Sequence, residues 1–357
     1  MRSFFDPRTI SRGALLGLAA ALLFGLSTPL AKLFVGEVQP VLLAGLLYLG
    51  SGIGLSVWWL VRRLKTPERS RPLKREELPY LAGAVVAGGM VAPACLMLGL
   101  ALTSAAGASL LLNLEGVLTA VIAWMVFKEN CDRRVVAGMI AITAGSAILT
   151  ISGQSGFALS WGSLLIVLAC LGWAVDNNLT RQISQADAVQ IALIKGLVAG
   201  ASNLAVALLF LSPTSPPLLT IASAMLVGFL GYGVSLALFV LALRHLGTAR
   251  TSAYFSTAPF VGAVLSVLIF AEPLSLALVG AATLMALGVY LHVTERHEHE
   301  HSHERLVHEH EHVHDDHHQH EHSHDDPSGE PHSHLHAHDP LVHSHPHYPD
   351  LHHRHEH

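Results

Sequence analysis

Charged residues are scarce in this chain. Only 13% of its 357 residues are Asp, Glu, Lys or Arg, whereas 51% are apolar. A soluble domain typically carries about 25% charged residues on its surface, so the composition excludes an ordinary soluble protein. Residues 294–357 are almost entirely polar, and the rest of the chain is therefore more apolar than the average indicates.

Cysteine is also scarce, and its three positions show no paired spacing. Cys95, Cys131 and Cys170 lie in or beside apolar segments. Such isolated cysteines are typical of small core residues, so we predict no disulfide.

Catalytic motifs are lacking as well. The sequence contains no nucleotide-binding loop, no nucleophile and base pair and no catalytic metal constellation. The polar joints between apolar segments are too short to fold as catalytic domains. We therefore expect no enzymatic activity, no required cofactor and no nucleic-acid partner.

Long apolar runs dominate residues 13–293. Each run is long enough to cross a bilayer of about 30 Å as a helix, and only such helices satisfy their backbone groups in lipid without closing a barrel. The pattern predicts an all-α membrane protein with ten transmembrane helices, at residues 13–34, 41–61, 79–101, 104–127, 134–153, 161–180, 189–211, 218–243, 250–270 and 273–293.

Positive charge predicts the orientation of these helices. Nineteen of the 21 Lys and Arg residues fall on one side of the predicted membrane, and the two exceptions are Lys32 and Lys195. Because positive loops stay in the cytoplasm, both termini are expected to be cytoplasmic, with the protein in the inner (plasma) membrane. The apolar run after residues 1–12 lacks a cleavage signal and predicts a retained first helix.

The hydrophobic block repeats itself. Residues 100–150 resemble residues 241–292 at an offset of 143, which sets Glu129 against Glu272. Each copy holds five spans, and an odd number predicts that the second copy is inverted relative to the first, as in many secondary transporters. A second alignment, at an offset of 149, sets Phe24 against Trp173 and Lys32 against Arg181.

The repeat divides the chain into four predicted units. They are a cytoplasmic N-terminus (1–12), a first five-helix repeat (13–153), a second five-helix repeat (161–293) and a disordered, His-rich cytoplasmic tail (294–357).

A single glutamate joins the last two spans of each copy, in Phe127-Lys-Glu129 and in Phe270-Ala-Glu272-Pro. With ten spans in two repeats, this pattern resembles the EamA family of the drug/metabolite transporter superfamily. The resemblance implies a transporter over residues 12–293. It does not identify the substrate, because one fold carries many functions.

Glu115 lies near the middle of the fourth predicted span, two residues after Asn113. A charge at this depth is costly and marks a functional site by default. We interpret Glu115 as a proton-coupling carboxylate or a cation ligand that faces a cavity. The alternative is a structural carboxylate neutralised by a neighbouring donor.

A second polar group lies near the cytoplasmic end of span six. Asp176, Asn177 and Asn178 follow one another there, and Lys195 lies at similar depth in span seven. An ion pair across this helical hairpin, or a lysine that reaches toward water, is the structural interpretation. If they line the cavity, the side-chain oxygens of Asp176, Asn177 and Asn178 suit a divalent cation.

Other polar residues have structural interpretations. Glu129 and Glu272 are expected to cap the helix that follows each of them, where the helix dipole favours a carboxylate. Asn203 is expected to form a hydrogen bond between helices.

Histidine is concentrated in the tail, where 24 of the 26 histidines alternate with acidic and small residues. Neutral imidazoles at this density predict binding of Ni²⁺, Co²⁺, Zn²⁺ or Cu²⁺. A pH-responsive tail and a functionless low-complexity segment are the alternatives. The candidate ligands are His297, His299, His301, His303, His308, His310, His312, His314, His317, His318, His320, His322, His324, His332, His334, His336 and His338.

These patterns favour a secondary transporter that exports a divalent transition-metal ion, with protons as counter-ion and the lipid bilayer as its environment. In composition the tail resembles the His-rich segments of nickel and cobalt resistance permeases. One alternative is export of an organic metabolite or a metal chelate, with the tail as a metal sensor. Another is a metal-binding membrane protein without transport. A homodimer is possible in each case.

Overall fold

The computed structural model describes most of the apolar block and four short segments of the tail. The described residues are 12–65, 73–127, 133–152, 160–183, 186–211, 215–239, 241–242, 254–293, 298–303, 306–312, 332–338 and 341–346. The chain forms two compact units, Met1–Thr294 and Glu295–His357.

The described part of the first unit is helical. In its first half the elements are α1 (Arg12–Phe34), α2 (Pro40–Lys65), η1 (Arg75–Glu77), α3 (Leu78–Ala84), η2 (Val85–Val91), α4 (Ala92–Leu102), α5 (Ala105–Leu111), α6 (Leu114–Phe127) and α7 (Arg133–Ser152). In its second half they are α8 (Trp161–Gln182), α9 (Ala188–Phe210), α10 (Leu218–Gly228), η3 (Phe229–Val234), α12 (Ala258–Phe270) and α13 (Leu276–Val293).

Eight helical stretches among the described residues are long and apolar enough to cross a membrane. They match the first eight of the ten predicted spans. Where the last two were predicted, the structure has shorter apolar helices, Ala258–Phe270 and Leu276–Leu291. At 1.5 Å per residue the 13 residues of α12 extend about 20 Å, which is less than the bilayer core.

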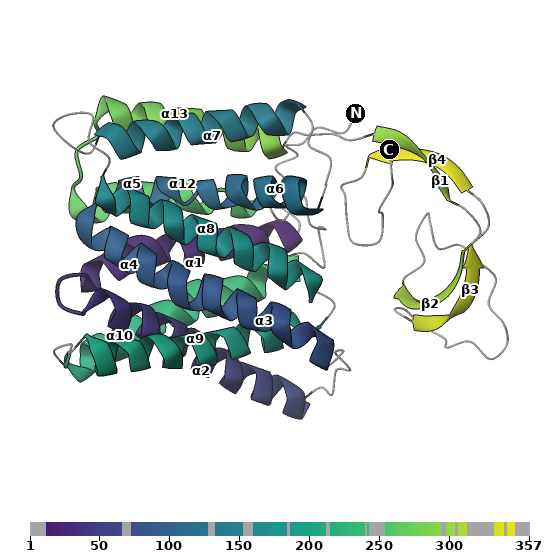
Figure 1. Cartoon of the computed structure of the whole chain (residues 1–357), viewed down its shortest axis with the longest axis horizontal. Helices are drawn as coiled ribbons and strands as arrows, with labels where there is room; N and C mark the ends of the chain where they lie inside the picture. The colour runs from purple at the N-terminus through teal and green to yellow at the C-terminus, as the bar shows by residue number, and fades with distance from the viewer. Residues whose placement is uncertain are drawn as a thin grey trace. The chain divides into compact units, whose positions relative to one another are not determined.

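The helices lie side by side in one bundle (Figure 1). Helices α7 and α13 pack together at one edge, and α2 packs against α9 at the opposite edge. Helix α10 also packs on α2, and this contact needs a glycine, because a Cβ on Gly228 would lie 1.9 Å from the Leu47 carbonyl oxygen. Small residues thus allow close helix approach, as is usual in membranes.

The third membrane-length stretch of each half, Arg75–Leu102 and Leu218–Phe239, contains a π-helical segment. These segments, η2 and η3, begin at Val85 and Phe229, which are 144 residues apart (229 − 85). Each contains a glycine where a neighbouring helix approaches closely: a Cβ on Gly88 would meet the Asp176 carboxylate at 2.0 Å, and one on Gly231 would meet Ser27 at 2.5 Å. Single π turns inside α-helices are frequent at functional sites.

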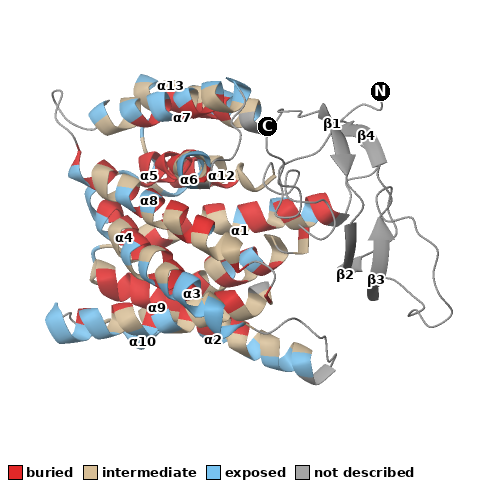
Figure 2. Cartoon of the chain, turned by 45° about the vertical axis from the view of Figure 1, so that its right-hand side comes forward, coloured by how far each residue is buried: buried red, intermediate tan, exposed pale blue. Residues whose placement is uncertain are grey.

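The exterior of the bundle is apolar. Large apolar side chains such as Leu209, Phe210 and Leu218 are more than 70% exposed, at 74%, 76% and 80%. Figure 2 shows exposed and intermediate residues along the outer helices and buried residues concentrated between them. An apolar exterior of this kind fits a lipid environment, where the hydrocarbon replaces water as the solvent.

Two of the three cysteines lie among the described residues. Cys95 and Cys170 are free, and Cys131 lies outside the described residues.

The tail was expected to be disordered, but the structure pairs four of its segments as antiparallel strands: β1 (Glu298–His303) with β4 (Leu341–Pro346), and β2 (Leu306–His312) with β3 (His332–His338). The alternation of histidine with a spacer residue has the period of two that a strand requires.

Candidate functional site

A break in the fourth membrane-length stretch, Ala105–Val126, positions Glu115. Helix α5 ends at Leu111, and α6 begins at Leu114. The carbonyls freed by the break are bonded: the Asn113 amide donates to the Leu110 oxygen at 2.9 Å, and the Cys170 thiol donates to the Leu111 oxygen at 3.5 Å. Glu115 therefore lies in the first turn of α6, in the middle of an apolar span.

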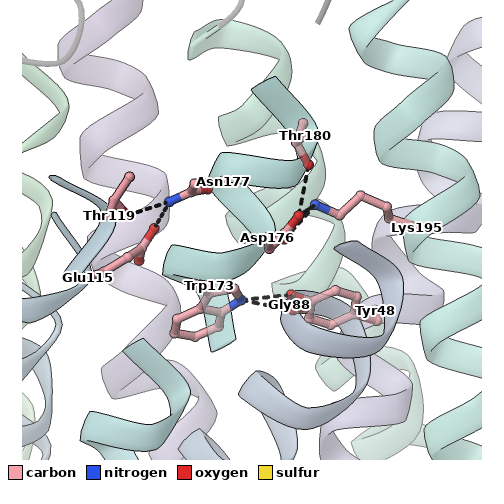
Figure 3. A network of polar contacts seen from close by, with 9 residues as sticks. All are labelled: Tyr48, Gly88, Glu115, Thr119, Trp173, Asp176, Asn177, Thr180 and Lys195. Atoms are coloured by element: carbon pink, nitrogen blue, oxygen red, sulfur yellow. Dashed lines mark hydrogen bonds and ion pairs between the residues drawn. The ribbon is translucent and has the colours of Figure 1, made fainter. Parts of the chain in front are cut away.

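Glu115 makes a polar contact with α8. The Asn177 amide nitrogen donates to Glu115 Oε1 at 2.8 Å and to Thr119 Oγ1 at 3.4 Å (Figure 3). Among the described residues no cationic side chain pairs with this carboxylate. Glu115 is half-buried and Asn177 is exposed. The contact is therefore partly exposed rather than enclosed in a close-packed core.

Asp176 lies on another side of α8 and has a full set of partners. Lys195 Nζ lies 2.6 Å from both of its carboxylate oxygens, and the Thr180 hydroxyl donates to Oδ1 at 2.8 Å (Figure 3). The carboxylate is buried, at 5% exposure for the residue. The predicted ion pair across the α8–α9 hairpin is thereby confirmed.

The other predicted amides do not join Glu115. Asn113 is buried at the helix break, with its amide also 3.9 Å from the Met285 sulfur. The Asn178 amide donates to the carbonyls of Ala174 and Thr119 at 2.8 and 3.2 Å. Both side chains therefore satisfy backbone carbonyls. The Asn203 amide donates to the Gly89 carbonyl at 3.1 Å, which confirms the predicted bond between helices.

A group of aromatic residues between the halves was missed by the sequence analysis. Trp173 Nε1 donates to the Gly88 carbonyl at 2.9 Å and to the Tyr48 hydroxyl at 3.3 Å, and that hydroxyl donates to the same carbonyl at 2.8 Å. The Tyr48 ring lies 5.5 Å from that of Tyr232, whose ring is 5.9 Å from Phe24. Tyrosines in the middle of apolar spans were the available signal, since a buried hydroxyl needs a partner.

A narrow space, too small to hold a water molecule, lies between α1, α5 and α12. The first and last of these helices belong to different halves of the chain, so this space is at their junction. It is lined by Phe24, Gly25, Thr28, Ser109, Leu112, Ala258, Pro259 and Gly262.

Glu272 does not cap the helix that follows it, contrary to the prediction. Its carboxylate accepts hydrogen bonds from the backbone of Ala105 at 2.7 Å and Ala106 at 3.1 Å, at the start of α5. The N-terminus of α13 uses Ser275 instead, whose hydroxyl accepts from Leu278 N at 3.1 Å. The reason is distance along the chain: Ser275 directly precedes α13, whereas Glu272 lies three residues earlier. Glu129 is outside the described residues.

The candidate metal ligands of the tail are only partly described. Ten of them lie on the strands: β1 carries His299, His301 and His303, β2 carries His308, His310 and His312, and β3 carries His332, His334, His336 and His338. The other seven lie outside the described residues: His297, His314, His317, His318, His320, His322 and His324. Among the described residues, no three or more His, Cys, Asp or Glu side chains are placed together so that they could hold a metal ion.

The sequence model of the EamA-like transporter family matches this chain twice, over residues 11–151 and 160–294. The chain belongs to the EamA-like transporter family. It is therefore an integral membrane transporter, and its two family matches meet between α7 and α8. The family gives no substrate.

Individual relatives agree with this assignment. An uncharacterized transporter of Methanothermobacter thermautotrophicus is 26% identical over 292 residues, covering 77% of this chain and 84% of its own length. The uncharacterized transporter YyaM of Bacillus subtilis is 24% identical over 273 residues, covering 74% and 88%. One crystal structure matches with a TM-score of 0.60 at 22% identity, over 80% of this chain and 99% of that chain, so the fold is shared.

Proposed function

We propose that this EamA-like protein is a secondary transporter of ten spans that works by alternating access between two inverted five-helix halves. It lies in the inner (plasma) membrane with both termini in the cytoplasm. The double family match and the equivalent positions of η2 and η3 support the repeat. The odd number of spans per copy supports the inversion, and the distribution of Lys and Arg supports the orientation.

Glu115 is the charged group of the central site in this proposal. The supporting observation is the contrast between two carboxylates that contact the same helix. Asp176 is neutralised by Lys195 at 2.6 Å, whereas Glu115 contacts an amide at 2.8 Å and no described cation. A mid-membrane carboxylate without a cationic partner is costly unless a proton or a cationic substrate neutralises it. One carboxylate that binds either a proton or a cation couples export of the cation to entry of the proton.

The first candidate substrate is a divalent transition-metal ion, and the tail supports it. The register of β2 and β3 sets His308 opposite His336, His310 opposite His334 and His312 opposite His332. Opposed positions in an antiparallel ladder lie about 4.5–5.5 Å apart at Cα. In β1 and β4 the register sets His299 opposite His345 and His301 opposite His343. We infer that such pairs collect metal ions for export.

The second candidate is an organic metabolite with a positive charge, or a metal chelate, with the tail as a metal sensor. The aromatic group supports it, because Trp173 lies on α8 one helical turn before Asn177, which contacts Glu115. Aromatic faces beside a carboxylate suit an organic cation, which gains from both stacking and cation–π contact.

Metal flux in sealed proteoliposomes tests the proposal. Ni²⁺, Co²⁺ and Zn²⁺ uptake is measured for the full chain, for a deletion of residues 297–357 and for Glu115→Gln. The matched control is Glu37→Gln, which changes an exposed carboxylate at the α1–α2 joint. Loss of a charge-assisted contact worth about 1.5–3 kcal/mol predicts that Glu115→Gln lowers flux by about tenfold or more.

The outcomes separate the candidates. Reduced flux in the deletion, together with loss of flux in Glu115→Gln, supports export of the metal itself. No metal flux with metal still bound by the tail favours the organic substrate, which is then sought with the same vesicles. Wild-type flux in Glu115→Gln removes this carboxylate from the mechanism.

A further inference from the structure

The joint between α4 and α5 is bound by charged side chains from both halves of the chain. Lys32, at the end of α1, donates from Nζ to the carbonyls of Leu100 and Thr103, the latter at 2.8 Å. Glu272, just after α12, accepts from Ala105 N and Ala106 N at the start of α5. A cation thus meets the C-terminus of one helix and an anion the N-terminus of the next, as the helix dipoles favour.

The two sets of bonds differ in one respect. Lys32 and the joint belong to the same half of the chain, whereas Glu272 is 166 residues or more from the amides that it binds. Both of those alanines are fully buried, at 0% exposure. Two backbone donors of the first half are therefore satisfied by a carboxylate of the second half.

The backbone that presents Glu272 is strained. Ala271 ends α12 in the left-handed region, at φ 50° and ψ 38°. Glycine is the usual residue there, because a Cβ makes that conformation costly. Such outliers persist only where surrounding contacts hold them. Here the hydrogen bonds between the Glu272 carboxylate and the backbone of α5 are the contacts that hold Ala271 in this conformation.

The joint lies one helical turn from the space between the halves. Thr28 and Ser109 line that space, four residues from Lys32 and from Ala105 respectively. Beyond Ser109, α5 runs to the break that carries Glu115. The joint and Glu115 therefore lie at opposite ends of α5, with Glu115 in the first turn of the following helix, α6.

We propose that Lys32, Glu272 and the α4–α5 joint form a latch that closes this end of the bundle and opens during transport. The inference rests on the alternating access proposed above. A cap within one half can stay closed permanently, but a cap between halves that move apart must break. When it breaks, water takes over the bonds of the carboxylate and of the two amides, so opening is reversible. Lys32 holds the joint in place within its own half while Glu272 leaves.

Thiol accessibility tests the latch without any substrate, so the identity of the cargo does not enter. Cys95, Cys131 and Cys170 are replaced by alanine, and Thr28→Cys is added as a reporter inside the space under the joint. Sealed right-side-out vesicles are treated with a membrane-impermeant thiol reagent, and the labelling rate is measured. The parent, with the latch closed, is expected to label slowly.

Variants of the latch should move this rate in opposite directions. Glu272→Gln should raise it by about tenfold, which corresponds to the loss of one charge-assisted bond. Ala271→Gly should lower it, because glycine adopts the left-handed conformation without strain and stabilises the closed latch. Glu272→Asp should lie between the parent and Glu272→Gln. Glu37→Gln, a charge removal at the same end of the bundle, should leave it unchanged.

A static cap gives a different result. If Glu272→Gln lowers the melting temperature but leaves the labelling rate of Thr28→Cys unchanged, the carboxylate is structural and the latch is wrong. If Glu272→Gln does not fold, the direction of the change in Ala271→Gly decides alone. Failure of metal and metabolite flux would overturn the proposed function, whereas an unchanged labelling rate would overturn only the latch.

Discussion

At the scale of single residues, two carboxylates that contact α8 partners, Asp176 and Glu115, differ in the partners that they have. Asp176 is buried, ion-paired and hydrogen-bonded, so both of its oxygens are satisfied. Glu115 has an amide donor and accessible surface. The first arrangement holds α8 against α9, whereas the second leaves the carboxylate without an ion pair among the described residues. Mutations at the two positions should therefore act on different properties.

Asp176→Asn should mainly reduce stability. Removal of one partner of a buried ion pair leaves Lys195 uncompensated, which typically costs about 3–5 kcal/mol. The double variant Asp176→Asn/Lys195→Met should recover most of the loss, because it removes both charges. Thermal unfolding in detergent measures the difference, and Glu37→Gln serves as the control. A single variant as stable as the parent would show that the pair contributes nothing to the fold.

At the scale of helices, close approach rather than side-chain size sets the packing. Gly228 brings α10 against the backbone of α2, and its missing Cβ would lie 1.9 Å from the Leu47 carbonyl oxygen. In contrast, a Cβ on Gly280 of α13 would meet no atom of the described residues within 4 Å. Both residues are helical glycines in apolar surroundings, so they form a matched pair.

Gly228→Ala should separate α2 from α10 and lower stability by about 1–3 kcal/mol, the usual cost of overpacking. Gly280→Ala should be neutral or stabilising by up to about 1 kcal/mol, because alanine has the higher helix propensity. Melting temperatures of the two purified variants give the comparison. Equal losses would mean that helix propensity, and not the contact with Leu47, decides the effect.

The sequence predicted most helices because their signal is local: an apolar run of sufficient length needs no knowledge of its neighbours. The ion pair of Asp176 with Lys195 was predictable for a similar reason, since a short joint holds both residues at one depth. The partner of Glu272 was not predictable, because it lies in the other half of the chain. The bond from Asn113 to Leu110 was not predictable either, since the helix break that turns this side chain leaves no periodic signal.

At the scale of the whole molecule, the number of spans decides the mechanism. Two inverted halves require an odd number of spans in each half, and α12 and α13 are needed to complete the second. They are also the two helices that fall short of the length of the other eight. The location of the C-terminus does not distinguish an eight-span from a ten-span topology, because both even numbers place it on the same side of the membrane as the N-terminus.

The joint between α12 and α13 does distinguish them. With ten spans it lies outside the cell, and with eight it lies in the cytoplasm. Leu274 is 69% exposed in this joint, so Leu274→Cys in the cysteine-free background is a suitable reporter. We expect it to react with an impermeant thiol reagent added outside intact cells, as should a cysteine at position 155, between the two halves. A cysteine at position 68, between α2 and α3, should react only after the cells are opened.

A Leu274→Cys that reacts only in opened cells, while position 155 reacts outside, would place α12 and α13 on the cytoplasmic side of the membrane. The second half would then have three spans, and the inverted repeat would be lost. Glu272 would also lie on the side opposite to the α4–α5 joint, which its bonds to Ala105 and Ala106 forbid if both form in one state. In the proposed ten-span topology, the contacts of Glu272 with Ala105 and Ala106 form when α12 crosses the bilayer despite its length, with the adjoining residues 254–257 completing the passage.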